Sequence, residues 1–495
     1  MRITNKMMTN NMLHNINVNK NNMSTLEGKY SSGMEIQKPS DDPIVAVRAL
    51  KLRTNLSELN QYYNKNIPDA MSWMEVTESA LKNTSEIITQ IHTYCTQGAN
   101  DTLTVDERKS IVQNLQELKN QIYQEGNSNY AGRYLFTGYK TSTSLVFENQ
   151  ETNLEYKITE KIEASKIDIS NRIIDSTIDS ELESNIVTYN NSIQSGAKER
   201  PTSQTVYRIR LAYGKLEDKD ITIKVGGSTI VPERLTSGET DSKKLEPYNP
   251  KPGTINYLTD TGEIIMSEDV YNAYRNSDFE IEYYKDTFEK NELRPEHYFD
   301  CTSTNKSNGE EVTYTKEEQE ITYEVNFNQR IAINVQAKDA FRPSLGRAID
   351  DIVKAISDVD AVKEKIKKVD KLLEDPLITE AEKTAATEMK GVLNSELSLK
   401  DSLMRKAYEK CLSAMDAEED VVNAATSSIG TRYNRLELTQ DRLSTQQVEF
   451  TDLLSQNEDA DLVDTIVNYN AANTVYNASL QAAGKVVKNT LLDFI

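Results

Sequence analysis

The chain has few of the residues that build catalytic and metal sites. Among its 495 residues are only three histidines and three cysteines, and no histidine has a second histidine or a cysteine at metal-ligand spacing. The sequence also lacks a phosphate-binding P-loop, the glycine fingerprint of dinucleotide sites, an HExxH motif and a nucleophile elbow. We therefore expect no enzyme and no catalytic, cofactor or metal site.

The three cysteines, Cys95, Cys301 and Cys411, are far apart in the sequence. Their separations do not give a zinc-ligand pair, and an odd number of cysteines cannot form a complete set of disulfides. We expect three free, buried thiols.

Basic residues are outnumbered, with 57 Lys and Arg against 78 Asp and Glu and a formal charge of −21. This balance opposes binding to nucleic-acid phosphates or to an anionic lipid surface. No apolar run reaches the roughly 18 residues of a membrane span. The first twenty residues have neither an apolar core nor a small-residue cleavage site, so the sequence predicts no cleaved signal peptide and no nucleic-acid or membrane partner.

Acidic residues cluster in two places that lack the loop glycine and ligand spacing of a calcium-binding EF-hand. The clusters are Asp416, Glu418, Glu419 and Asp420, and then Glu458, Asp459 and Asp461. We expect solvated helix faces at both, with the second cluster also able to cap the helix that follows.

Proline is unevenly distributed. Six of the 11 prolines fall between residues 201 and 295, and none follows Pro376. Because proline breaks helices, this confines long helices to the two flanks. The apolar content of 37% is below the roughly 45–50% of compact domains and favours elongated helical layers.

Both ends of the chain carry an apolar stripe with the heptad spacing of a helix that packs against another helix. We expect an assembly interface formed by Met12, Ile16, Met23, Leu26, Tyr30, Leu462, Ile466, Tyr469, Tyr476, Leu480, Ala483 and Val487.

Between these ends, the periodicity predicts a long helix from Leu52 to Tyr94, kinked or restarted at Pro68. A second helix should start at a capping box of Thr104 and Glu107 and stop before Gly126. On the return flank the heptad phase slips at residues 456–460, which indicates a joint between two bundles. A break around residues 374–377 predicts a helical hairpin over about 355–410.

The middle of the chain changes to period-two alternation, which is typical of strands. Examples are residues 154–158, 221–225 and 321–325, and turn signals occur at 226–227 and 308–309. The predicted fold class is therefore mainly α with a β-rich insert.

The sequence predicts an elongated coiled-coil helical bundle, formed by the N- and C-terminal segments, with an outer β domain between them. The terminal coiled coil should comprise residues 1–42 and 457–495. The helical bundle should comprise 43–140 and 336–456, and the outer β domain 141–335.

Six strings resemble the bacterial flagellin superfamily. The first is Tyr30-Ser31-Ser32-Gly33, and the second is Lys38-Pro39-Ser40-Asp41-Asp42-Pro43. The second string resembles the motif of the family branch that joins the hook to the filament. Flagellins usually carry a version of this motif that ends in Asp-Asp-Ala-Ala-Gly. The other strings are the decapeptide 129–138, and the C-terminal segments 428–437, 457–462 and 490–495.

The resemblance implies a structural subunit of the bacterial flagellum that joins the hook to the filament. Such a subunit would be exported unfolded through the flagellar type III apparatus without a cleaved signal peptide, and would be extracellular. Its implied partners are further copies in a ring, a neighbouring hook-associated protein, flagellin and an export chaperone.

Three alternatives stay open. Flagellin itself is the first, although Pro43 and the Asp-Phe-Ile ending argue against it. A type III translocator or coiled-coil adhesin is the second, but a translocator should carry a long apolar segment, which is absent. An enzyme of unrecognised type is the third.

Overall fold

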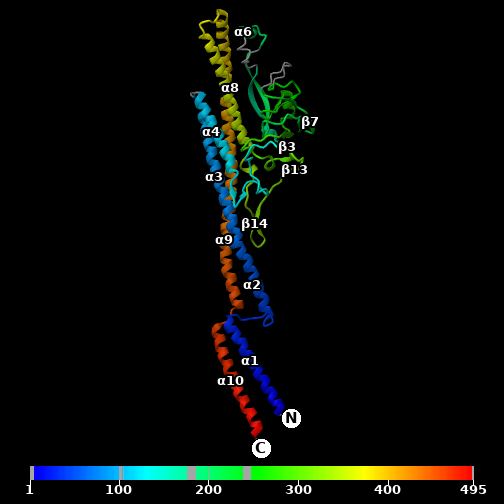
Figure 1. Ribbon diagram of the computed structural model, residues 1–495, viewed down its shortest axis with the longest axis vertical. Coiled ribbons are helices and arrows are strands. Elements are labelled where there is room, and N and C mark those ends of the chain that lie inside the picture. Colours follow the sequence, from blue (N-terminus) through cyan, green and yellow to red (C-terminus); the bar gives the residue numbers. More distant parts are fainter. Residues whose placement is uncertain are drawn as a thin grey trace. The chain divides into compact units, whose positions relative to one another are not determined.

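The computed structural model describes residues 5–99, 103, 105–174, 185–198, 200–237 and 247–492 (Figure 1). The chain forms two compact units. Unit 1 comprises Met1–Met71, Tyr323–Ile331 and Asn434–Ile495, and unit 2 comprises Ser72–Thr322 and Ala332–Tyr433. Each unit thus combines segments from both halves of the sequence.

Unit 1 is built from helices α1 (Asn5–Ser32), α2 (Pro43–Gln61) and α10 (Leu462–Leu492), together with the last part of α9 (Glu380–Glu458). Helix α1 packs against α10, and both chain termini lie at the same end of this pair (Figure 1). A hairpin of strands β14 (Thr322–Asn326) and β15 (Gln329–Ala332) contributes Phe327, whose ring packs edge-on against Tyr62.

The predicted disturbance at Pro68 takes the form of a π-helical turn, η1 (Tyr62–Asn66), between α2 and α3 (Ile67–Gly98). The Ile67 N–H donates to the Tyr62 carbonyl, five residues back. Since proline lacks an N–H and its ring crowds the carbonyl four residues earlier, a wider turn before Pro68 lets the helix continue without a break.

The joint predicted at residues 456–460 is present, because α9 ends at Glu458 and α10 begins at Leu462. Two backbone bonds tie this joint to the end of α1. The Glu35 N–H donates to the Glu458 carbonyl at 2.7 Å, and the Ala460 N–H donates to the Gly33 carbonyl at 2.9 Å. Gly33 has a φ of +70°, a conformation that glycine adopts at the lowest cost after a helix.

The helices of unit 2 are most of α3, α4 (Val105–Glu125), α8 (Pro343–Leu373) and the first part of α9. Their facing sides are buried, with Trp73, Leu81, Ile88, Met415 and Ile429 at 1% exposure or less. Helix α4 ends where Gly126 predicts. Thr104, which should cap its start, lies outside the described residues.

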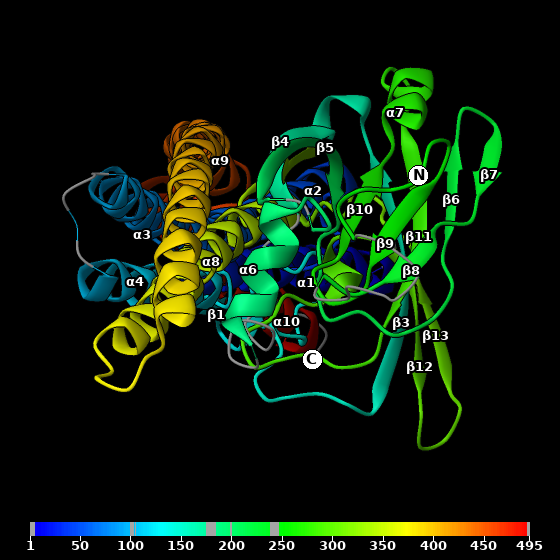
Figure 2. The same cartoon turned by 90° about the horizontal axis from the view of Figure 1, so that it is seen from above.

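Helices α8 and α9 turn at residues 374–379. The Thr379 hydroxyl and the Glu382 carboxylate form a reciprocal capping box, in which the Glu382 N–H donates to Thr379 and the Thr379 N–H donates to Glu382. Such a box satisfies amides that the first turn of a helix leaves free. A short helix, α6 (Ile186–Gln194), packs its apolar side against this hairpin (Figure 2).

Besides the two-stranded sheet of β1 (Asn129–Tyr130) and β2 (Arg133–Tyr134), the β part of unit 2 has two larger sheets that share one core. One has the order β4-β5-β10-β9-β8 and the other β13-β12-β3-β11-β6-β7, and all pairs except β8 with β9 are antiparallel. The strands and their short helices are β3 (Leu154–Ile162), β4 (Asp168–Ile174), β5 (Thr202–Arg210), β6 (Thr222–Val225), β7 (Ser228–Ile230), β8 (Glu233–Leu235), β9 (Ile255–Leu258), β10 (Glu263–Met266), α7 (Glu268–Tyr274), β11 (Phe279–Lys285), β12 (Asp300–Asn305) and β13 (Glu311–Tyr314).

Strand β11 shows why this segment folds as it does. Its burial alternates strictly, and Phe279, Ile281 and Tyr283 enter the shared core. The predicted strands at residues 154–158, 221–225 and 321–325 correspond to β3, β6 and β14. The prediction of a mainly α fold with a β-rich insert is confirmed.

Candidate assembly interface

Helix α1 turns one narrow face toward α10. Its partly buried side chains recur with alternating spacings of three and four, as a two-helix seam requires. They are Thr9, Met12, Ile16, Asn19, Met23 and Leu26. Four of the five predicted N-terminal residues lie on this face, and the fifth, Tyr30, stacks on Tyr469 with ring centroids 6.4 Å apart while remaining half exposed.

Helix α10 uses a face rotated from the predicted stripe. The partly or fully buried residues are Thr465, Tyr469, Ala472, Asn473, Tyr476, Ser479 and Ala483. Of the predicted residues, Tyr469, Tyr476 and Ala483 belong to this face. Leu462, Ile466 and Leu480 lie beside it and are 49%, 40% and 42% exposed. The side chain of Val487 is outside the described part of α10.

A second apolar stripe runs along the opposite side of α10, and sequence reasoning missed it. Its members are all exposed: Val463, Val467, Ala471, Thr474, Ala478 and Ala482. Val463 and Val467 are 73% and 62% exposed. The spacings of three and four would have identified this stripe, but alanine and threonine are weak apolar signals beside the leucines and tyrosines of the first one.

The terminal pair has no core of its own. None of the described side chains of α1 is buried, and Thr465 is the only buried one among the described side chains of α10. A pair of helices that buries so little apolar surface gains little free energy to offset the entropy of ordering its backbone.

The base of the pair, where α9 ends at Glu458 and α10 begins at Leu462, is instead held by polar contacts. Arg53 of α2 donates to the Glu458 carboxylate at 2.6 Å, and Glu458 is 7% exposed. Asp461 caps α10 by accepting from the N–H groups of Val463 and Asp464. The cap is as predicted, whereas the expectation of a solvated face is wrong for Glu458, because its carboxylate is buried and accepts from the partly exposed Arg53.

The motif at residues 38–43 builds the start of α2. The Lys38 N–H donates to the Asp41 carboxylate at 2.9 Å, which closes a turn. Asp42 then caps α2 by accepting from the N–H groups of Ile44 and Val45, and Pro43 occupies the first helical position. Proline is favoured there because its missing N–H would have had no partner within the helix.

Glu418 of α9 likewise departs from the predicted solvated face. It is 3% exposed and accepts from Arg342 at 3.1 Å and from Ser344 at 2.7 Å. Both partners flank the start of α8, so this carboxylate binds one helix of unit 2 to the next.

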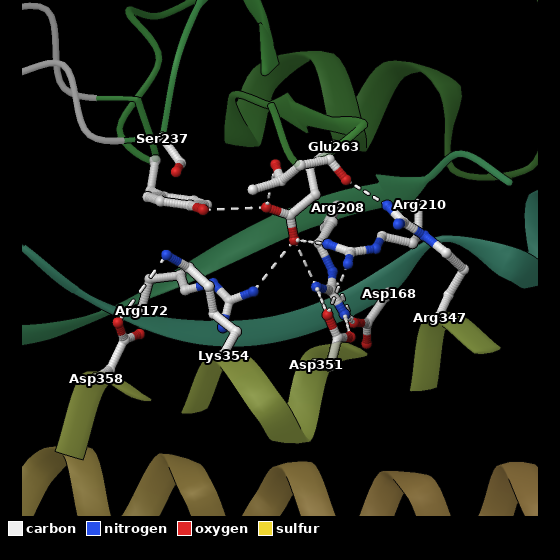
Figure 3. A network of polar contacts seen from close by, with 12 residues as sticks. Asp168, Arg172, Arg208, Arg210, Ser237, Glu263, Arg347, Asp351, Lys354 and Asp358 are labelled. Carbon is white, nitrogen blue, oxygen red and sulfur yellow. Dashed lines mark hydrogen bonds and ion pairs between the residues drawn. The ribbon is translucent and has the colours of Figure 1, made fainter. Parts of the chain in front are cut away.

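A second cluster of charged side chains lies between the five-stranded sheet and α8 in unit 2 (Figure 3). Arg208 of β5 donates to Glu263 of β10 at 2.6 Å and to Asp351 of α8 at 2.7 Å. Arg210 and Arg172 also donate to Glu263, at 2.7 and 3.2 Å. Glu263 is 1% exposed.

Burial alone would raise the pKa of the Glu263 carboxyl, but attraction to Arg208, Arg210 and Arg172 outweighs it and holds the pKa well below the usual value. The same balance, with Arg208 as the main partner, lowers the pKa of Asp351. Carboxylates that remain ionised and paired are poor general bases. This ion-pair network therefore holds the five-stranded sheet against α8.

No described helix combines the length and apolarity needed to cross a bilayer. The residues that the structure describes also contain no group of three His, Cys, Asp or Glu side chains arranged to hold a metal ion.

The terminal helices match a known family in both halves of the chain. Residues 3–141 match the bacterial flagellin N-terminal helical region, and residues 412–495 match the bacterial flagellin C-terminal helical region. The matched regions comprise the helices that form the α1–α10 pair and its base. Both flanks of the chain therefore carry the helical regions of the bacterial flagellin family.

The relatives include flagellins and flagellar hook-associated proteins. The flagellin of Clostridium tyrobutyricum is 34% identical over 128 residues, which are 26% of this chain and 34% of that protein. The flagellar hook-associated protein 3 of Salmonella typhimurium is 30% identical over 145 residues, which are 29% of this chain and 45% of that protein. The chain thus spans less than half of the length of either relative.

A solved structure of a putative flagellar hook-associated protein from Vibrio parahaemolyticus covers 85% of this chain and 100% of its own, at 13% identity and a TM-score of 0.36. This similarity is low, and the family assignment does not depend on it.

Proposed function

We propose that the chain is a structural, non-enzymatic subunit of the bacterial flagellum that joins the hook to the filament, as a hook-associated protein 3. The Lys-Pro-Ser-Asp-Asp-Pro form at residues 38–43 favours this branch over flagellin. In the assembled structure, α1 and α10 would pack against the same helices of neighbouring copies, and the β sheets would face solvent.

The main support for this proposal is that α10 has two apolar faces, one covered and one exposed. One apolar face is covered by α1, whereas the stripe containing Val463 and Val467 has no cover in unit 1. Burying a valine side chain contributes roughly 1.5–3 kcal/mol. Two such valines per subunit, together with the alanines and the threonine of the stripe, would favour association of neighbouring copies and would order a helix pair that has no core alone.

The remaining parts of the proposal follow from the family. Residues 1–42 and 457–495 would form the inner coiled-coil domain, 43–140 and 336–456 the helical bundle with its hairpin at about 355–410, and 141–335 the outer domain. The chain would be exported unfolded, without a cleaved signal peptide, with a chaperone covering its ends. Its neighbours would be further copies in a ring, another hook-associated protein and flagellin.

Flagellin is the second candidate, since a flagellin is among the relatives with significant identity. The two functions differ in copy number and place. Immunogold labelling of isolated flagella should mark one position between hook and filament. Labelling along the whole filament would show that the chain is flagellin.

The assembly role is tested by Val467→Asp, which places a charge on the uncovered stripe of α10. The matched control is Asn468→Asp, which adds the same charge to the next, exposed residue on a different side of the helix. Both monomers should melt as the parent does, because both positions are exposed. Only Val467→Asp should abolish filament attachment, and equal attachment by both variants would overturn the proposed interface.

A further inference from the structure

Two of the three cysteines meet inside unit 2, although 316 residues separate them in the sequence. The Sγ atoms of Cys95 in α3 and Cys411 in α9 lie 3.3 Å apart, and both side chains are 0% exposed. The third cysteine, Cys301 of β12, belongs to the core of the β sheets. All three are free thiols, as the sequence predicts, but the meeting of two of them has no signal in the sequence.

We propose that Cys95 and Cys411 form a disulfide that ties α3 to α9 when the chain folds in an oxidising environment. A disulfide requires the sulfur atoms to be about 2.05 Å apart, so they must approach by roughly 1.25 Å. This approach has to come from rotation about the side-chain bonds of the two cysteines together with any shift of α3 and α9 that the bond requires. The compartment, outside the cell, rests on the proposed function, but the pairing itself rests only on the geometry of unit 2.

The reaction removes two protons and two electrons from the two thiols, so an oxidant must take up the electrons. A low-molecular-weight disulfide serves by thiol–disulfide exchange. One cysteine thiolate attacks it and releases one thiol, and the second cysteine then attacks the mixed disulfide and releases the other. Molecular oxygen is the alternative oxidant and yields hydrogen peroxide from the same two electrons.

The fold also determines when the bond can form. The contact with Cys95, together with burial, raises the pKa of Cys411. Since the thiolate is the reactive form, the thiols of the closed bundle react slowly at neutral pH. Oxidation is therefore fast while the chain folds and slow once α3 and α9 have closed around the pair.

A bond between these positions would close a loop that contains most of unit 2. Cross-links that close long loops restrict the unfolded chain strongly and raise the melting temperature. Segments from both halves of the sequence would then remain attached to each other under load, which suits a subunit that must fold once and remain folded outside the cell.

The test uses the full-length chain refolded from denaturant with oxidised glutathione as the oxidant, followed by alkylation and peptide mass spectrometry. Cys301→Ser is the control that retains the pair, and Cys411→Ser removes one partner. The parent and Cys301→Ser should each yield a peptide that links Cys95 to Cys411. Their melting temperatures should be several degrees higher than those of the same chains after reduction with dithiothreitol. Cys411→Ser should yield neither.

A second measurement adds the same oxidant to the already folded chain. The link should then form much more slowly than during refolding. Three results would overturn the pairing: all thiols remain alkylatable after refolding, the link involves Cys301, or only mixed disulfides with glutathione form. These outcomes concern the isolated chain, so they leave the assembly test of Val467→Asp independent.

Discussion

Helices α1 and α10 at the ends of the chain share a heptad pattern with α3 and α9 in unit 2, yet the two regions differ in what they bury. Along α3 and α9 of unit 2, apolar side chains such as Leu81, Ile88 and Met415 are completely buried. Along the described part of α1 none is buried. Periodicity therefore predicts that a helix has a stripe, but not how many neighbours cover it.

The difference in burial distinguishes helices that are stabilised by folding of the single chain from helices that need assembly with other copies. The helices of unit 2 have their partners within the chain, so they are expected to be stable in the monomer. In the terminal pair, α1 and α10 pack against each other and α10 keeps an exposed apolar stripe, so the stability of the pair should depend on other copies.

Glu263→Ala should produce the largest loss of stability. It leaves the buried guanidiniums of Arg172, Arg208 and Arg210 without their shared carboxylate, and breaking such a buried network costs about 3–5 kcal/mol. Thermal unfolding followed by circular dichroism measures the effect. Glu364→Ala, which removes an exposed carboxylate of α8 paired with Lys367, should leave the melt unchanged. Equal melting temperatures for both variants would show that the ion-pair network around Glu263 does not stabilise the folded chain.

Leu81→Ala and Leu13→Ala compare the two regions with one chemical change. Leu81 of α3 is 0% exposed, and Leu13 of α1 is 55% exposed. The first change should cost about 2–5 kcal/mol through the cavity it creates, and the second less than about 0.5 kcal/mol. Urea unfolding of the monomers gives both values. Similar losses would mean that α1 is as well packed as α3.

Acidification should destabilise unit 2. The folded-state pKa of Glu263 lies well below the usual 4.5, and that of Asp351 is also lowered. These groups contribute stability that is complete above about pH 4.5 and is lost as the pH falls toward their folded-state pKa values. Melting temperatures measured from pH 7 to pH 3 should fall below pH 4.5. Glu263→Gln, which cannot titrate there, should show a smaller decline over the same range.

Leu480→Asp should have the smallest effect on the monomer. Leu480 is 42% exposed beside the face that contacts α1, so a charge there is solvated in the free chain. In an assembly, an unpaired carboxylate at a helix interface costs several kcal/mol. The purified variant should melt within a degree of the parent yet fail to retain filaments on the hook. A monomer that loses several degrees would assign Leu480 to an ordinary core.

Local rules account for the elements of this fold. The strand at residues 154–158, the disturbed helix at Pro68 and the joint before Leu462 can each be read from neighbouring residues. The family motif around Asp42 can also be read locally, since its side chain caps the helix that follows it.

Features that depend on distant residues could not be predicted from the sequence. Glu458 and Arg53 are 405 positions apart, and Cys95 and Cys411 are 316 apart. An acidic residue in a polar helical segment looks solvated until the fold supplies an arginine. The second stripe of α10 was missed for another reason, because alanine and threonine are weak apolar signals.

The central claim is that the terminal pair obtains its stability from assembly, whereas unit 2 does not. Amide hydrogen exchange of the full-length chain, measured as a dilute monomer and again in assembled hook-filament junctions, tests it most directly. Backbone amides of α1 and α10 should exchange rapidly in the monomer and slowly in the assembly, while those of α3 and α9 in unit 2 are slow in both. Slow exchange throughout α1 and α10 in the dilute monomer would contradict the account.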